Sequence, residues 1–317
     1  MNKYVIVILL LSFNLLFSQN LKGVDFIVSN YPQFNSIDEV SNRIEKDFYL
    51  EKEKVRAVYT WMANNIRYGE FILQTPKVFL YTSQKDLEEQ IEKRIEDSAT
   101  RTFNSKKGIC YDYAALFYKI CTNLDIKTEI IKGFAKTKVT ATNSTKITSI
   151  INNHAWNKVF IDDKPYLIDT TWSVNILPNI NGYIKDINYD YFLTNPNLFI
   201  LNHYPENFED SLIKDDLSAL TFINYPIIYM RSYKNVRLIR PIKSKINRNI
   251  KTNTKFTFRV IKPVNEVSFY LGNKFYDNIP YNYENSILTF DLDLEDNNDN
   301  NLTVFINNKA ICSYWVE

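Results

Sequence analysis

Three side chains that could carry out chemistry together occur in the order Cys110, His154 and Asp169. A cysteine becomes an effective nucleophile when a base takes its proton and a third group orients that base. The 317 residues contain two histidines, so there are few candidates for the base. His203 stands in a turn-like Asn-His-Tyr-Pro segment without an obvious acidic partner, and we expect it to be structural or a further polar group near the site. His154 is therefore the predicted base.

Cys110 stands where a helix is expected to begin. Apolar residues at positions 114, 117, 121 and 124 recur at steps of three and four, which is typical of a helix with one buried face. Gly108 can adopt backbone angles closed to other residues, so it would let the chain turn sharply into that helix. A helix N-terminus favours a thiolate, whereas Asp112 in the first turn opposes one although it suits the helix dipole. The alternative for any cysteine is a buried apolar role, and Cys121 keeps that interpretation.

A predicted β-hairpin brings the base and the acid together. Residues 155–161 and 164–169 flank an Asp-Asp pair, and a two-residue loop there makes Ile161 face Lys164. Asp169 then lies opposite Trp156 and diagonal to His154 on one face of the hairpin. A loop longer or shorter by one residue would move Asp169 to the other face. The alternatives are that Asp169 caps the following Thr-Thr-Trp turn and that His154 is structural.

The remaining pattern predicts helices first and strands later. Ser36 and Glu39 form a capping-box pattern that begins one helix, and further helices are expected at 50–65 and 84–97. The charged helix at 84–97 is expected to lie on the domain, with a solvated connector or a lid as alternatives. A strand at 128–134 precedes a loop at 137–148, and residues 175–221 read as irregular. Alternating apolar residues then predict strands of a small antiparallel sandwich, at 256–260, 267–271, 288–294 and 302–306.

Composition narrows the functional classes. The net charge of +2, with 23% charged residues, gives no electrostatic basis for binding nucleic acid. Two histidines and scattered carboxylates provide no recognisable metal spacing, and residues 295–301 lack the glycine and terminal glutamate of a calcium loop. We therefore expect no metal and no cofactor. Cys110 and Cys121 would lie roughly 16 Å apart on one helix, too far for a disulfide, so at least one of the three thiols stays free.

The first residues predict export. Asn2 and Lys3 precede an apolar run at 5–17 that is too short for a confident membrane span, and Ser18-Gln19 follows. We expect a signal peptide over 1–19, an exported protein (periplasmic, cell-surface or secreted) and no integral membrane segment after cleavage. An uncleaved anchor is the alternative. No cysteine lies near this junction, so the sequence does not support attachment of a lipid there.

Three short motifs resemble those of the transglutaminase-like superfamily. They are Gly108-Ile109-Cys110, His154-Ala155-Trp156-Asn157 and Asp169-Thr170-Thr171-Trp172, in that order. The kyphoscoliosis-peptidase branch is the more similar one, because it also has a helix like 59–68 before the cysteine and segments like 191–193 and 203–205 after the aspartate. The resemblance spans about residues 55–205.

This resemblance implies an α+β chain. Residues 20–224 would form a papain-like, transglutaminase-like domain with N-terminal helices packed on an antiparallel sheet. Residues 225–317 would form a small all-β, Ig-like sandwich.

The implied activity is acyl transfer from a peptide or glutamine amide through a thioester on Cys110, with His154 as base and Asp169 as its orienting acid. Water as acceptor gives a protease or amidase, and a lysine amine gives a crosslinking enzyme. The Cys110 N–H is the expected oxyanion donor, with Tyr68, Trp156 and Trp172 as further candidates beside the site. The expected partner is a peptide or protein substrate. The alternative is a catalytically silent binding or scaffold protein at the cell surface, with the sandwich as an adhesion module.

Overall fold

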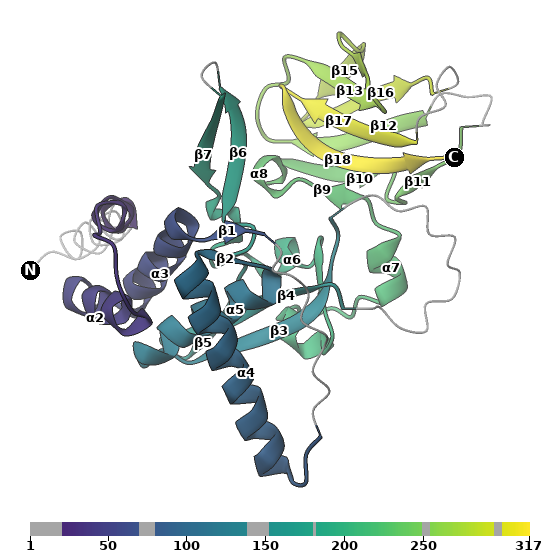
Figure 1. Cartoon of the computed structure of the whole chain (residues 1–317). Helices are drawn as coiled ribbons and strands as arrows, with labels where there is room; N and C mark the ends of the chain where they lie inside the picture. Colours follow the sequence, from purple (N-terminus) through teal and green to yellow (C-terminus); the bar gives the residue numbers. More distant parts are fainter. Residues whose placement is uncertain (1–20, 70–79, 138–151, 180–181, 249–253, 295–299) are drawn as a thin grey trace, which may run out of the picture. The chain divides into compact units, whose positions relative to one another are not determined.

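The computed structural model divides the chain into two compact units (Figure 1). Residues up to 132 and 154–195 form the first unit, and residues 133–153 and 196–317 form the second. The structure describes residues 21–69, 80–137, 152–179, 182–248, 254–294 and 300–317. The predicted signal peptide, most of the predicted loop at 137–148 and most of the acidic run at 295–301 lie outside these ranges. The division does not follow the predicted boundary at residue 224.

Helices open the first unit, as the sequence predicts. Residues 21–29 are helical and are followed by α2 (Ile37–Asp47) and α3 (Glu51–Asn65). The Ser36 side chain accepts from the Glu39 N–H, so the predicted N-cap is confirmed. The Glu39 carboxylate reaches back to the N–H of Asn35, one residue before the cap.

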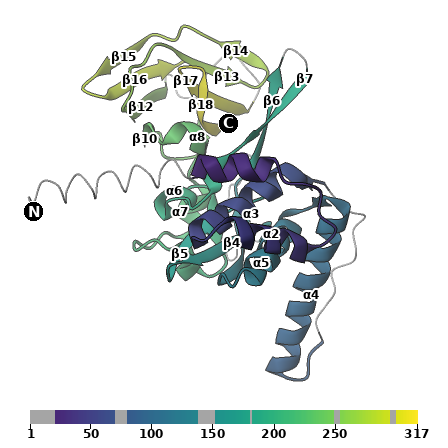
Figure 2. The same cartoon turned by 90° about the vertical axis from the view of Figure 1, so that its left-hand side faces the viewer.

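The charged helix is longer than the predicted 84–97. Helix α4 runs from Gln84 to Ser105, and Figures 1 and 2 show its first half extending beyond the rest of its unit. Within this helix Ile95 is buried, whereas Ile91 is 41% exposed. The sequence pattern missed the last two turns because their buried face consists of small and aromatic residues that pack against the next helix, α5 (Cys110–Asn123), namely Ser98, Ala99, Thr102 and Phe103.

An antiparallel sheet follows α5, and its hairpin has the predicted register. Strand β4 (His154–Ile161) pairs with β5 (Lys164–Ile168), with Ile161 opposite Lys164 and Asn157 opposite Ile168. Asp162 and Asp163 both have positive φ, at 49° and 61°. That backbone is typical of the tight two-residue turn whose twist matches the flanking strands. Residues 128–132 of β3 (Thr128–Ala135) belong to the same unit.

One continuous core joins these elements. Residues of α2, α3, α5 and the β4–β5 hairpin form a single cluster of buried apolar side chains, including Val58, Phe117, Val159 and Ile168. Helix α5 packs directly on β4. Burial of the α5 stripe fixes the rotation of the helix that begins at Cys110.

The segment predicted as irregular contains a second hairpin. Strands β6 (Val174–Asn179) and β7 (Gly182–Ile187) form a two-stranded antiparallel sheet, so the prediction for this part of 175–221 is wrong. Pro178 argued against a strand, but each strand of a two-stranded sheet is an edge, where proline is tolerated. The 3-10 turn η1 (Tyr189–Tyr191) completes the unit.

The second unit begins with short elements. Residues 133–135 of β3 pair with β8 (His203–Pro205). The other short elements are α6 (Pro196–Phe199), η2 (Phe208–Ser211), α7 (Ala219–Ile223), β9 (Ile227–Ile228) and α8 (Met230–Tyr233). Among the described residues, no helix combines the length and apolarity that crossing a membrane requires.

The rest of the second unit is the predicted β-sandwich. Its two sheets have the strand orders β10-β12-β16-β15 and β11-β18-β17-β13-β14, and β9 pairs with β18. Aromatic residues of both sheets meet in one core, where the Phe256 and Tyr314 rings lie 5.5 Å apart. The strands are β10 (Val236–Arg240), β11 (Lys245–Ile246), β12 (Thr254–Val260), β13 (Val267–Leu271), β14 (Lys274–Tyr276), β15 (Tyr281–Glu284), β16 (Ile287–Leu292), β17 (Asn301–Ile306) and β18 (Lys309–Val316).

Candidate active site

Cys110 is the accessible thiol of the three. It is the first residue of α5 and is partly exposed, whereas Cys121 and Cys312 are buried. Burial raises the pKa of each of these two buried thiols to about 12. Only the thiol at the helix N-terminus therefore has both the access and the surroundings of a nucleophile.

Two short strands fix the approach to Cys110. Strand β1 (Arg67–Tyr68) pairs in parallel with β2 (Lys107–Gly108), with Tyr68 beside Gly108. The Gly69 N–H donates to the Gly108 carbonyl over 3.1 Å. The end of α3 is thereby tied to the residues that directly precede the nucleophile.

Gly108 is required by close packing. Its φ does not lie in the left-handed region, so the expected need for unusual backbone angles is wrong. A Cβ atom at this position would lie 2.7 Å from the Asp112 Cβ and 3.2 Å from Thr102 Cγ2. The helix approaches so closely here that only a hydrogen atom fits.

Asp112 does not present an uncompensated charge. Its buried carboxylate accepts hydrogen bonds from the Ile109 N–H at 3.0 Å, from Arg101 Nη2 at 2.6 Å and from the Ser98 hydroxyl. Arg101 and Ser98 belong to the part of α4 whose extent the sequence pattern missed. The positive guanidinium offsets the repulsion that we expected between this carboxylate and a Cys110 thiolate.

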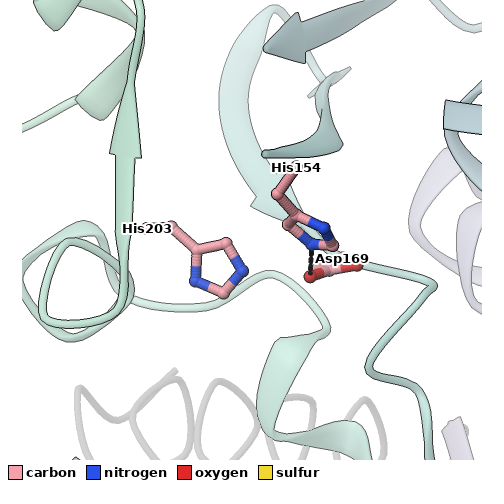
Figure 3. Close-up of side chains that lie close together, drawn as sticks. All are labelled: His154, Asp169 and His203. Atoms are coloured by element: carbon pink, nitrogen blue, oxygen red, sulfur yellow. Dashed lines mark hydrogen bonds and ion pairs between the residues drawn. The ribbon is translucent and has the colours of Figure 1, made fainter. Parts of the chain in front are cut away.

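His154 and Asp169 are hydrogen-bonded to each other. The Nε2 atom of His154, the first residue of β4, lies 2.7 Å from Oδ2 of Asp169, the residue directly after β5 (Figure 3). Both side chains are buried. The predicted hairpin register thus places the two side chains in contact, with Nδ1 as the remaining ring nitrogen.

The Asp169 carboxylate is held on several sides. Its Oδ1 accepts from the N–H of Thr171 at 2.8 Å and from that of Trp172 at 3.4 Å. Its own N–H donates to the Tyr191 carbonyl over 3.0 Å. The carboxylate therefore caps the following turn and binds His154 at the same time, so the two interpretations of this residue are compatible.

The protonated form of His154 is favoured. Burial lowers the pKa of the ring, but the charge and hydrogen bond of Asp169, and the hydrogen bond and charge of Cys110, together raise it to about 10. Both the thiol and the carboxylate thus stabilise the charged form of the ring. An imidazolium that faces a thiol stabilises the thiolate in turn.

Aromatic side chains surround the imidazole. The rings of Trp156 and Trp172 lie 6.1 and 5.5 Å from the His154 ring, and Trp172 packs edge-on against Tyr191 at 5.0 Å. Trp156 is buried, whereas Tyr68 is 62% exposed and lies 6.4 Å from the Tyr113 ring. The roles predicted for Tyr68, Trp156 and Trp172 stay predictions.

The second histidine has structural contacts within its own unit. His203 lies in β8, pairs with Ala135 and is 1% exposed. Its ring stacks on Phe199 at 4.1 Å. The two roles expected for His203, a structural one and that of a further polar group near the site, stay predictions.

One residue of the site was not singled out in the sequence. Asn157 lies in β4, is fully buried and donates from Nδ2 to the Ala114 carbonyl over 3.0 Å. A buried amide normally needs such a partner. An asparagine within a strand whose other residues are mainly apolar is the signal that could have revealed it.

Sequence comparison adds family information. Residues 38–169 match the model of the family described as the transglutaminase-like superfamily. This range contains Cys110, His154 and Asp169, the last of which is its final residue.

Curated relatives match parts of the chain. Human kyphoscoliosis peptidase is 26% identical over 207 residues, which are 65% of this chain and 29% of that protein. Cytokinesis protein 3 of Schizosaccharomyces pombe is 29% identical over 150 residues, which are 46% of this chain and 16% of that protein. The chain thus spans less than a third of the length of these relatives. A solved structure of a TGase shares 14% identity, covers 49% of this chain and 37% of its own, and has a TM-score of 0.27.

Proposed function

We propose that this chain, whose residues 38–169 belong to the transglutaminase-like superfamily, is a cysteine-nucleophile acyl-transfer enzyme that acts on peptide or glutamine amides. The observation that carries the proposal is the buried His154–Asp169 hydrogen bond, together with the Cys110 side chain as a second hydrogen-bonding neighbour of the same ring. Nucleophile, base and orienting acid are the set that such catalysis needs.

The reaction begins with attack of the Cys110 thiolate on the amide carbonyl carbon. A carbon–sulfur bond forms, and the carbonyl electron pair moves to oxygen, where the Cys110 N–H at the helix N-terminus is placed to donate. The intermediate collapses when the amine leaves with the proton of His154, and a thioester remains on Cys110. Asp169 holds the ring and stabilises its charged form throughout.

The second half of the reaction depends on the acceptor. His154, now neutral, removes a proton from water or from an amine, which attacks the thioester and regenerates the thiolate. Water makes the chain a protease or amidase, and a lysine amine makes it a crosslinking enzyme. We include both acceptors in the proposal.

Export is part of the same proposal. The polar start and the apolar run at 5–17 support a signal peptide, and an exported enzyme would meet peptide or protein substrates outside the cytoplasm. Expression of the full chain with a C-terminal tag tests export, because the tag allows the exported protein to be recovered and its N-terminus to be determined. Export predicts a mature N-terminus near residue 20 in the exported fraction, and a chain that keeps Met1 there would count against cleavage.

Thiol labelling tests the catalytic proposal directly. Iodoacetamide should alkylate Cys110 of the native protein much faster than a free cysteine at pH 6, because the proposed mechanism requires an activated thiol. His154→Gln should slow this alkylation, while Cys121→Ser should leave it unchanged because Cys121 is buried. Peptide mapping by mass spectrometry assigns the labelled residue.

Activity assays complete the test. The chain is incubated with casein, and both peptide release and incorporation of a fluorescent amine are measured for the wild type and for Cys110→Ala. Loss of either activity in the variant supports the proposal. Equal activity in both proteins, or a Cys110 that reacts no faster than free cysteine, would overturn it and favour the silent binding protein.

A further inference from the structure

Asp112 has more contacts than a surface acid in a first helical turn needs. It is 4% exposed, although a carboxylate at a helix N-terminus is usually solvated. Its two oxygens accept from one backbone N–H and two α4 side chains. The catalytic scheme above assigns it no role.

Both backbone polar groups of Ile109, its N–H and its carbonyl, are hydrogen-bonded. Its N–H donates to Asp112 Oδ2 over 3.0 Å, and its carbonyl accepts from the Tyr113 N–H over 3.0 Å. The Ile109 carbonyl and the Cys110 N–H belong to the same planar peptide group and point in opposite directions. Fixing Ile109 therefore sets the direction of the Cys110 N–H, which points out of the N-terminal end of the helix because it lies in the first turn.

The carboxylate itself is fixed from α4. Arg101 Nη2 lies 2.6 Å from Oδ1 of Asp112, and the Ser98 hydroxyl donates to the same oxygen. Helix α4 packs along α5 at this point (Figure 1). Gly108 fits beneath Asp112 because it has no Cβ atom. The carboxylate is thus immobile and its charge is offset.

We propose that Asp112 is a positioning residue that aims the Cys110 N–H at the oxyanion, while Arg101 cancels the charge of Asp112 beside the thiolate. This inference rests on the proposed function, because it concerns the tetrahedral intermediate of acyl transfer. Asp112 acts through Ile109 and touches no reacting atom. Its effect should be confined to steps that develop an oxyanion.

Two reagents separate such steps from simple thiolate chemistry. The Cys110 thiolate attacks the carbonyl carbon of p-nitrophenyl acetate, and an oxyanion forms before p-nitrophenolate leaves and the acetyl thioester remains. Alkylation by iodoacetamide displaces iodide in one step and forms no oxyanion. The ratio of the acylation rate to the alkylation rate therefore reports on the oxyanion donors alone, after subtraction of the Cys110→Ala background.

Asp112→Ala should lower this ratio. We expect acylation to slow by about tenfold or more, since loss of a whole oxyanion donor costs about 100- to 1,000-fold and misdirection costs part of that. Alkylation should stay within about twofold. Asp112→Asn keeps one acceptor oxygen and should lie between wild type and alanine, and it replaces the alanine variant if that one fails to fold.

Two further variants serve as comparisons. Asp125→Ala removes an exposed acid just beyond the other end of α5, at a position with φ of 57°, so it strains the backbone without reaching Ile109. Its ratio should equal that of the wild type. Arg101→Gln leaves the Asp112 charge without its guanidinium, so both reactions should slow. The ratio should fall less than in Asp112→Ala, because the Ser98 hydroxyl and the Ile109 N–H still hold the carboxylate.

The possible results separate the two proposals. An unchanged ratio in the Asp112 variants, or equal slowing of both reactions, would overturn the positioning role while a reactive wild-type Cys110 keeps the proposed function. A wild-type Cys110 that is acylated no faster than the Cys110→Ala background would overturn the proposed function, and this inference with it.

Discussion

Asn157 donates a hydrogen bond of 3.0 Å from its side-chain Nδ2 to the carbonyl oxygen of Ala114. Ala114 lies about one turn after Cys110 on α5, and Asn157 lies three residues after His154 on β4. The bond joins the strand that carries the base to the helix that carries the nucleophile. The same Nδ2 atom also lies 3.4 Å from the Glu129 carbonyl, so it links α5, β4 and β3.

Asn157→Ala should loosen this junction. We expect unfolding free energy to fall by about 1–3 kcal/mol, because buried carbonyl groups lose their donor. Acylation of Cys110 by p-nitrophenyl acetate should slow as well. Urea unfolding measures the loss of stability, and p-nitrophenolate release measures the acylation rate.

The control is Asn64→Ala. Asn64 is exposed and its Nδ2 lies 3.4 Å from the Ser29 hydroxyl, so this variant should change the unfolding free energy by less than about 0.5 kcal/mol. Equal urea midpoints for the two variants would contradict this role of Asn157.

His154 should remain protonated well above neutral pH. Its pKa is raised from 6.5 to about 10, so its pairing with Asp169 and Cys110 stabilises the fold fully below about pH 6.5 and this contribution is lost as the pH rises towards 10. The sequence has two histidines, so carbon–proton NMR spectra should contain two ring Cε1–H signals, and His154→Gln assigns them.

Asp169→Asn should lower the pKa of His154, because burial then opposes the charged ring with less compensation. The difference in unfolding free energy between wild type and this variant should shrink as the pH rises from about 6.5 to 10. A His154 signal that titrates near 6.5 in the wild type would contradict the pairing seen in the structure.

Gly108→Ala should destabilise the protein by about 1–3 kcal/mol, the usual range for overpacking. The added methyl group would lie 2.7 Å from the Asp112 Cβ, within a helix that cannot move away easily. Gly69→Ala is the matched control, since the nearest atom to its added Cβ is Cδ of the flexible Lys107 side chain at 3.8 Å. Thermal unfolding compares the two. Similar melting temperatures for both variants would show that the contact at Gly108 is relieved.

A part-buried ion pair joins the helical residues 21–29 to α3. Asp25 binds Arg56 in a bidentate pair at 2.8 Å, and the guanidinium lies 3.3 Å from the centre of the Tyr189 ring. Asp25→Ala leaves a buried cation, so we expect a loss of about 3–5 kcal/mol. In the Glu45–Lys54 pair Glu45 is 56% exposed, and Glu45→Ala should cost less than about 1 kcal/mol. Urea midpoints measure both, and equal losses would contradict the difference in burial.

The hairpin shows how far local patterns reach. Two aspartates between two strand-like segments predicted the turn, the turn predicted the register, and the register predicted that His154 and Asp169 share a face, all of which the structure bears out. The helix at Cys110 was predictable for a similar reason, because its apolar stripe repeats with the helical period. The central residues of the sandwich strands were predictable in the same way, because apolar and polar residues alternate along them.

The failures occur where the pattern depends on a remote neighbour. The last two turns of α4 bury small and aromatic residues, which have no charged stripe beside them to mark a helix. The β6–β7 strands contain a proline that only an edge position tolerates. Their pairing could not be deduced from composition.

The sequence by itself determined which residues could be nucleophile, base and acid, and it determined the register that joins the last two. The pairing of two strands that a two-residue turn connects is enough to determine this register. Only the tertiary structure decided that Cys110 meets this hairpin, that Arg101 offsets Asp112 and that Gly108 is needed for space. These relationships join segments far apart in sequence or on different helices, and they depend on how side chains fill one core, which no local period encodes.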